Sequence, residues 1–199
     1  FSHTRTMHVG TFQMLLVLVG TATIVTGKMV GSDVMTLPKK GQIRYFYDDG
    51  HVDEHACGSL VVLGVGTAMT VNDYEDLASR ISWNNDIVTV VSDHAPNWIA
   101  KTSHKAYADL TVALIKNLDD LIPPCKSSSP SIFIGGHSSS GMAAVMALPL
   151  LDFVPSGFIG FDPFNFNSPP SISIPAMVWG FSDTTCAVDV DKAAKAAYQ

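Results

Sequence analysis

Three consecutive serines, Ser138 to Ser140, stand between an apolar run and an alanine-rich run. The apolar run at 132–136 is typical of a buried strand, and the run at 141–151 is typical of a helix. A strand that leads directly into a helix makes a sharp turn, which exposes the side chain at its apex. A serine hydroxyl exposed in this way can attack a carbonyl carbon when a base accepts its proton. The three serines lie where this apex is expected.

Serine is also a common residue at a helix N-terminus, so the three serines alone could form an ordinary polar turn. A second feature favours a reactive site. The apolar run at 59–67 ends in a loop that contains Gly64 and Gly66, and glycines allow the backbone to approach a substrate closely. Together, the loop and the serines could supply both the nucleophile and the backbone N–H groups that stabilise an oxyanion.

These residues need a scaffold, and strands alternate with helices along most of the chain. Residues 34–50 have the pattern of a hairpin. The buried strands are expected at 59–67, 86–93, 132–136, 157–162 and 172–180, and the helices at 74–81, 107–121, 141–151 and from 189 onward. This alternation predicts an α/β fold, with a mainly parallel sheet and helices on both faces, in a single domain at 31–199.

Composition narrows the possible partners. The net charge is −6, with 12 Lys and Arg residues and no basic run longer than Lys39–Lys40, so no nucleic-acid partner is expected. The three cysteines, Cys57, Cys125 and Cys186, lack metal-ligand spacing and allow at most one disulfide. We therefore expect neither a metal nor an organic cofactor.

The N-terminal region contains an uncharged, mostly apolar run at 9–26, with Arg5 before it and Lys28 after it. Its length suits a targeting or membrane-anchor segment, which we assign to 1–30; burial as a helix or a pair of strands in the core is the alternative. The first interpretation implies a secreted, organellar or membrane-associated protein, with possible membrane contact through residues 9–26.

The segment from Gly136 to Gly141 resembles the G-x-S-x-G elbow of the α/β-hydrolase superfamily, with Ser140 in place of the second glycine. The order of elements from about Gly41 to Gln199 is similar to that of the single-domain esterases, which include polyester hydrolases, dienelactone hydrolases and chlorophyllases. The resemblance implies that Ser138 is the nucleophile and that the Ser139 N–H is one oxyanion donor. The second donor would come from the loop of Gly64, Val65, Gly66 and Thr67.

The resemblance also implies an acid and a base that follow the serine in the order Ser, acid, His. Asp183, after the last expected strand, and Asp162, after the strand at 157–162, are the two candidates for the acid, and Asp183 is slightly favoured. All seven histidines precede Ser138: His3, His8, His51, His55, His94, His104 and His137. The expected base would then lie beyond Gln199, after a further helix and the last strand of the sheet. His94 is a substrate-contact candidate and a substitute base.

The sequence therefore predicts a serine hydrolase that cleaves a small or polymeric carboxylic ester through an acyl-enzyme, with slow turnover by this chain if the base is absent. The alternative is a non-catalytic scaffold of the same fold, or a membrane-complex subunit, that has lost the histidine. A dinucleotide-binding domain is disfavoured because residues 64–69 lack the third glycine of G-x-G-x-x-G, and only Asp93 could serve as its acidic residue.

Overall fold

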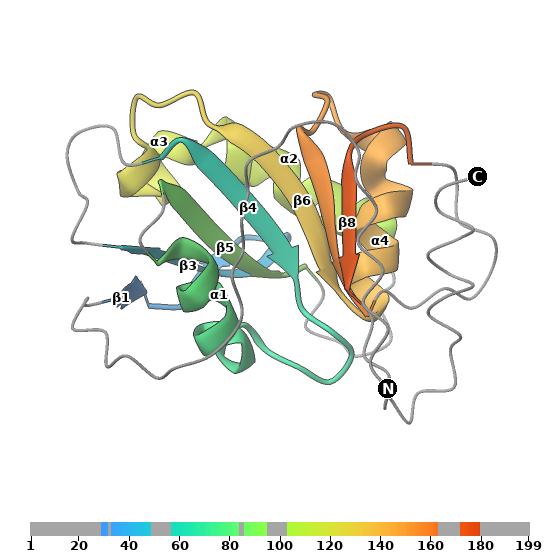
Figure 1. Ribbon diagram of the computed structural model, residues 1–199, viewed down its shortest axis with the longest axis horizontal. Coiled ribbons are helices and arrows are strands. Elements are labelled where there is room, and N and C mark those ends of the chain that lie inside the picture. The colour runs from blue at the N-terminus through green and yellow to red at the C-terminus, as the bar shows by residue number, and fades with distance from the viewer. Residues whose placement is uncertain are drawn as a thin grey trace, which may run out of the picture.

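The computed structural model describes residues 29–31, 33–48, 57–83, 86–94, 103–162 and 172–179. Within these ranges, eight strands form one sheet (Figure 1). The strands are β1 (Met29–Gly31), β2 (Met35–Leu37), β3 (Gly41–Asp48), β4 (Ser59–Gly64), β5 (Ile87–Asp93), β6 (Ser131–His137), β7 (Gly157–Phe161) and β8 (Ala176–Trp179). Their order is β1-β3-β5-β4-β6-β7-β8, and β2 pairs with β3 beside this path.

The centre of the sheet is parallel. Strands β5, β4, β6, β7 and β8 run in the same direction, and β3 joins β5 in antiparallel orientation. The register aligns Gly64 of β4 with Ser92 of β5 and Gly136 of β6, so the three strands end at the same edge. This arrangement confirms the predicted α/β class with a mainly parallel sheet. The predicted hairpin is also present, because β2 and β3 pair in antiparallel orientation across the turn at 38–40.

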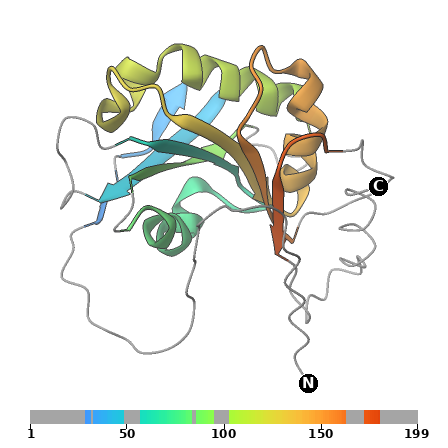
Figure 2. The ribbon, with the colours of Figure 1, turned by 45° about the horizontal axis from the view of Figure 1, so that its top comes forward.

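Helices cover both faces of the sheet in the described part of the chain (Figure 2). The 3₁₀ turn η2 (Val71–Tyr74) and helix α1 (Glu75–Ser82) lie on one face. Helices α2 (His104–Lys116), α3 (Leu118–Leu121) and α4 (Ser139–Ala147) lie on the other, with the 3₁₀ turns η4 (Pro123–Cys125) and η5 (Leu148–Leu150). Strands buried between two helical layers need apolar side chains in both directions, which explains the continuous apolar run of β4.

Each face has its own apolar cluster. On the α1 face, Val71 and Ala78 pack with Phe46 and Val91 of the sheet. On the opposite face, the alanines of α4 pack against Ile134 and Phe158, because their small side chains allow the helix to approach the strands closely.

The predicted helix at 107–121 is wrong in one respect: the structure divides it into α2 and α3 at Asn117. The backbone of Asn117 leaves the helical region, with φ −120° and ψ 29°, and its side-chain amide donates to the Ala113 carbonyl at 2.7 Å. Asparagine readily forms such local side-chain bonds, which compete with helix continuation. Periodic leucines on both sides of the break hid it in the sequence.

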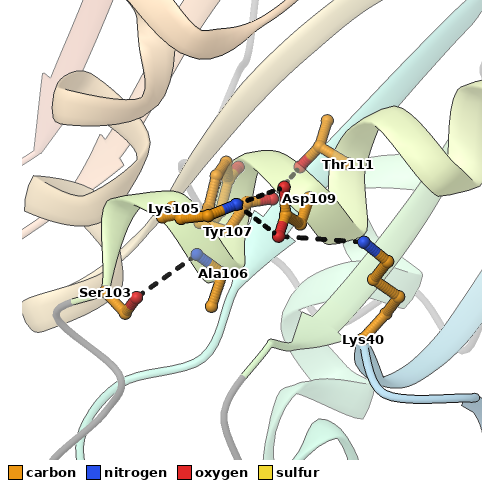
Figure 3. A network of polar contacts seen from close by, with 7 residues as sticks. All are labelled: Lys40, Ser103, Lys105, Ala106, Tyr107, Asp109 and Thr111. Atoms are coloured by element: carbon orange, nitrogen blue, oxygen red, sulfur yellow. Dashed lines mark hydrogen bonds and ion pairs between the residues drawn. The ribbon is translucent and has the colours of Figure 1, made fainter.

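The N-terminus of α2 is fixed by polar contacts at the surface (Figure 3). The Ser103 hydroxyl accepts the Ala106 N–H at 3.2 Å, as an N-cap does. Asp109 forms ion pairs with Lys105, at 2.9 Å, and with Lys40 in the β2–β3 turn, at 3.7 Å. These contacts join α2 to the edge of the sheet at which β5 ends.

A disulfide joins Cys57, just before β4, to Cys125 in η4. Both cysteines are buried. The sequence allowed one pair without identifying it, and the structure assigns these two residues to it.

Two of the predicted segments, 9–26 and the helix from 189 onward, lie outside the described residues. Among the helices that the structure describes, none is both long and apolar enough to cross a membrane.

Candidate active site

Ser138 lies between β6 and α4, at the apex predicted from the sequence. Its backbone has φ 51° and ψ −122°, a conformation that non-glycine residues rarely adopt. Two hydrogen bonds hold it there: the Ser138 N–H donates to the Phe161 carbonyl at 3.0 Å, and the Gly141 N–H donates to the Ser138 carbonyl at 3.0 Å. Surroundings that maintain such strain are characteristic of functional turns. The Ser138 side chain is only partly buried.

The strand before Ser138 needs glycine at positions 135 and 136, because neighbouring backbone crowds it there. A Cβ atom on Gly136 would lie 2.9 Å from the Gly64 carbonyl oxygen, and one on Gly135 would lie 1.8 Å from the Ile159 carbonyl oxygen. Side chains at these positions would push β6 away from its neighbours. The two glycines thus allow β4, β6 and β7 to converge at the turn.

Ser140 occupies the position where the elbow pattern usually has glycine. Its side chain is fully buried, and its hydroxyl donates to the Val65 carbonyl. The space for it comes from Gly64, since a Cβ atom on Gly64 would lie 2.6 Å from the Ser140 Cβ atom. The chain therefore accommodates the serine by placing a glycine opposite it.

The loop after β4 lies beside the serines. β4 ends at Gly64, so the predicted strand at 59–67 is shorter than expected and residues 65–67 form the loop. The Thr67 hydroxyl donates to the Ser139 hydroxyl oxygen at 2.9 Å, which joins the loop directly to the first residue of α4. The structure thus brings together the two regions predicted to supply the oxyanion donors.

The backbone N–H groups of this loop are not equally available. The Val65 N–H donates to the Ser92 carbonyl at 3.0 Å, and the Gly66 N–H donates to the Tyr74 hydroxyl at 2.7 Å. Within the described ranges, the Thr67 N–H has no acceptor, and Thr67 is exposed. The Ser139 N–H belongs to the first turn of α4, where N–H groups have no partner inside the helix. Thr67 and Ser139 therefore each have an N–H group without an acceptor among the described residues.

The two candidate acids differ in what the structure describes. Asp162 follows β7, and its backbone has φ 45° and donates from N–H to the Trp179 carbonyl at 2.6 Å. Its negative charge acts on His137, which lies before Ser138. Asp183 lies outside the described residues. The geometry thus places Asp162 near the turn.

No described histidine is hydrogen-bonded to the Ser138 hydroxyl. His94 follows β5, but it is 4% exposed and packs edge-on against the Tyr107 ring, with the ring centroids 5.4 Å apart. This burial favours a core role for His94 over the predicted substrate contact. His137 contacts the Tyr74 hydroxyl through Nδ1, at 2.7 Å.

The pair of His137 and Tyr74 was missed by the sequence analysis. Burial raises the pKa of Tyr74 well above its usual value, so its hydroxyl keeps its proton. Burial also lowers the pKa of His137, and the attraction of Asp162 only partly opposes this shift. The Tyr74 hydroxyl accepts the Gly66 N–H, and it lies 2.7 Å from His137 Nδ1 and 3.2 Å from the Met69 sulfur, so its one proton can be donated to either of these atoms. Tyr74 begins the apolar periodicity of the helical segment at 74–81, which indicates a core residue; the signal for the pair is its polar tip, which needs a partner when buried.

No known protein family matches the chain, and no curated protein is significantly similar to it.

Proposed function

We propose that this protein is a serine hydrolase of the α/β-hydrolase type, which cleaves carboxylic esters through an acyl-enzyme on Ser138. The observation that carries the proposal is the strained Ser138 backbone, with φ 51°, at the apex of a strand–helix turn to which the Thr67 hydroxyl is bonded through Ser139. The parallel sheet with helices on both faces supports the fold-level part of the proposal.

In the proposed reaction, the Ser138 oxygen attacks the ester carbonyl carbon and gives its proton to a base. The carbonyl oxygen becomes negatively charged, and the N–H groups of Thr67 and Ser139 donate to it. The bond to the alcohol oxygen then breaks, the alcohol leaves with the proton, and the acyl group remains on Ser138. Water hydrolyses this acyl ester by the same steps and releases the carboxylic acid.

Two elements of the proposal come from the superfamily resemblance. One is an acid, Asp162 or Asp183, which orients the catalytic histidine. The other is that histidine, which the resemblance places after the acid. Among the described residues, His94 is the substitute base to test, although its burial against Tyr107 disfavours the role. The proposed substrate is a carboxylic ester, either small or polymeric.

A fluorophosphonate probe tests the nucleophile, because it reacts covalently with an activated serine. We expect the probe to label the protein on the peptide that contains Ser138, and Ser138→Ala to abolish the labelling. Ser131→Ala is a matched control, since Ser131 is exposed at the opposite end of β6, and it should leave the labelling rate unchanged.

Failure to label Ser138 would contradict the proposal and favour the non-catalytic scaffold. Labelling of another serine, unaffected by Ser138→Ala, would also contradict it. A His94→Ala variant then identifies the base: a large loss of the labelling rate with a native melting temperature would assign that role to His94.

A further inference from the structure

All three residues of the loop at 65–67 are hydrogen-bonded to hydroxyl groups. The Ser140 hydroxyl donates to the Val65 carbonyl, the Tyr74 hydroxyl accepts the Gly66 N–H, and the Thr67 hydroxyl donates to the Ser139 oxygen. Two of these partners, Ser139 and Ser140, are consecutive residues that directly follow Ser138. The loop is thus bound to the same turn of α4 that presents the nucleophile.

We infer that Ser139 and Ser140 are positioning residues, whose hydroxyl groups hold the loop at 65–67 so that the Thr67 N–H stays directed to the oxyanion. This inference rests on the proposed function. An oxyanion site stabilises the transition state only if its donors are fixed before the reaction begins, because ordering them during the reaction would cost free energy. Val65 packs into the core, but Gly66 has no side chain and Thr67 is exposed, so the hydrogen bonds to hydroxyl groups supply the constraint that packing does not.

The burial of these serines supports a positioning role. Ser139 is 3% exposed and Ser140 is fully buried, so neither hydroxyl can serve as a second nucleophile at the surface. A buried hydroxyl is costly without a partner, which makes its hydrogen bond a strong constraint. Gly64 provides the space for the Ser140 side chain, since a Cβ atom there would lie 2.6 Å from that of Ser140. This fit indicates that the serine and the glycine function together.

The pair of Thr67 and Ser139 gives the clearest test. Thr67→Val has almost the same shape but no hydroxyl, whereas Thr67→Ser keeps the hydroxyl. We expect Thr67→Val and Ser139→Ala each to lower the maximal rate constant of fluorophosphonate labelling about tenfold. The probe concentration that gives half of the maximal rate should stay unchanged. The double variant should lose no more than either single one, because both changes remove the same hydrogen bond. Thr67→Ser should retain the rate.

Two substitutions of Ser140 test its hydroxyl in the same way. Ser140→Ala keeps the Cβ atom and removes only the hydroxyl, so it should lower the labelling rate constant about tenfold. Ser140→Gly restores the residue typical of the elbow pattern and removes the same hydroxyl, and it should lower the rate equally. A rate equal to that of the unmodified protein in both variants would show that the hydroxyl does not position the loop.

Amide hydrogen exchange separates this inference from the proposed function, because it requires no reaction. We expect exchange at the hydrogen-bonded amides of Val65 and Gly66 to become about tenfold faster in Thr67→Val and Ser140→Ala, and to stay unchanged in Thr67→Ser. Unmodified protein that does not react at Ser138 would overturn the proposed function alone. Unchanged exchange and labelling in the hydroxyl-free variants would overturn the positioning role alone.

Discussion

The two ends of strands β4 and β6 are held in different ways. At the amino ends, a disulfide between Cys57 and Cys125 fixes the entrance of β4, and the Ser131 N–H donates to the Gly58 carbonyl. At the carboxyl ends, the connections from the loop at 65–67 to α4 are hydroxyl hydrogen bonds. One end has a covalent constraint, and the other has several weaker, directional ones.

This difference matches the tasks that the two ends can perform. In parallel sheets, ligands bind beyond the carboxyl ends of the strands, where loops must present polar groups to a substrate. A covalent bond restricts the unfolded chain but does not direct a donor toward a ligand. Hydrogen bonds contribute less to stability, but they set the orientation of individual groups. We therefore expect substitutions at the amino ends of these strands to reduce stability, and substitutions at the carboxyl ends to reduce the reactivity of Ser138.

The largest effect on stability is expected from removal of the disulfide. Replacing Cys57 and Cys125 together by serine frees a loop with a sequence separation of 68 residues. Loop-closure entropy predicts a loss of about 4 kcal/mol in the free energy of unfolding. Urea denaturation of the double variant, compared with the unmodified protein, measures this loss.

The rate of fluorophosphonate labelling at Ser138, measured in the variant without the disulfide, is the control for this prediction. At a temperature well below the melting temperature, the rate should equal that of the unmodified protein, because the disulfide lies at the end opposite the serines. A rate that falls in proportion to stability would show that the two ends are not separate.

A smaller effect on stability is expected from the titration of His137, which lies at the carboxyl end of β6. Burial lowers the pKa of His137 below its unfolded value of about 6.5. Between these two pKa values the unfolded chain binds more protons than the folded one, so stability should fall as the pH decreases from about 6.5. His137→Asn keeps an acceptor for the Tyr74 hydroxyl but cannot titrate, and its stability should fall less steeply.

Urea midpoints at about pH 7.5 and 5.5, on either side of the unfolded value, measure this difference for both proteins. The other histidines and the carboxylates affect the pH dependence of stability equally in both proteins. The difference between the two pH dependences therefore reports on His137 alone. The same change in urea midpoint between the two pH values in both proteins would contradict the prediction.

The smallest effect is expected from the surface contacts at the N-terminus of α2. Lys105 and Asp109 form an ion pair at 2.9 Å, but their side chains are 74% and 41% exposed. Such pairs contribute little in water, so Lys105→Ala should lower the free energy of unfolding by less than about 0.5 kcal/mol. Thermal unfolding measures it, and the labelling rate at Ser138 should not change. A larger loss would mean that exposed charges, as well as buried hydroxyls, fix this edge of the sheet.

Much of the fold could be predicted from the sequence because its signals are local. Continuous apolar runs predicted the parallel strands, and the capping-box spacing of Thr70 and Asp73 is a local signal for the start of the helical segment on one face. The Asp73 carboxylate does accept the Thr70 N–H, at 2.7 Å. The break at Asn117 was missed because a single side-chain hydrogen bond decides it, and the leucine periodicity continues through it.

The site was predictable in its position but not in its connections. The turn at Ser138 follows from the change in composition between a strand and a helix. The contacts from Ser140 to Val65 and from Tyr74 to Gly66 join residues that are far apart or on different elements, so no local pattern reveals them. Ser140 instead appeared as a departure from a pattern, and the structure shows that Gly64 accommodates it.

The disulfide also has a mechanical consequence. A force applied to the two ends of the chain would bypass the segment between Cys57 and Cys125, because the load passes through the sulfur atoms. That ring contains β4, the loop at 65–67, α1, β5, α2 and α3. At about 3.4 Å per extended residue, roughly 230 Å of chain stays hidden from the pulling force until the bond is reduced. Single-molecule extension of this protein should therefore lengthen by about that amount when a reductant is added.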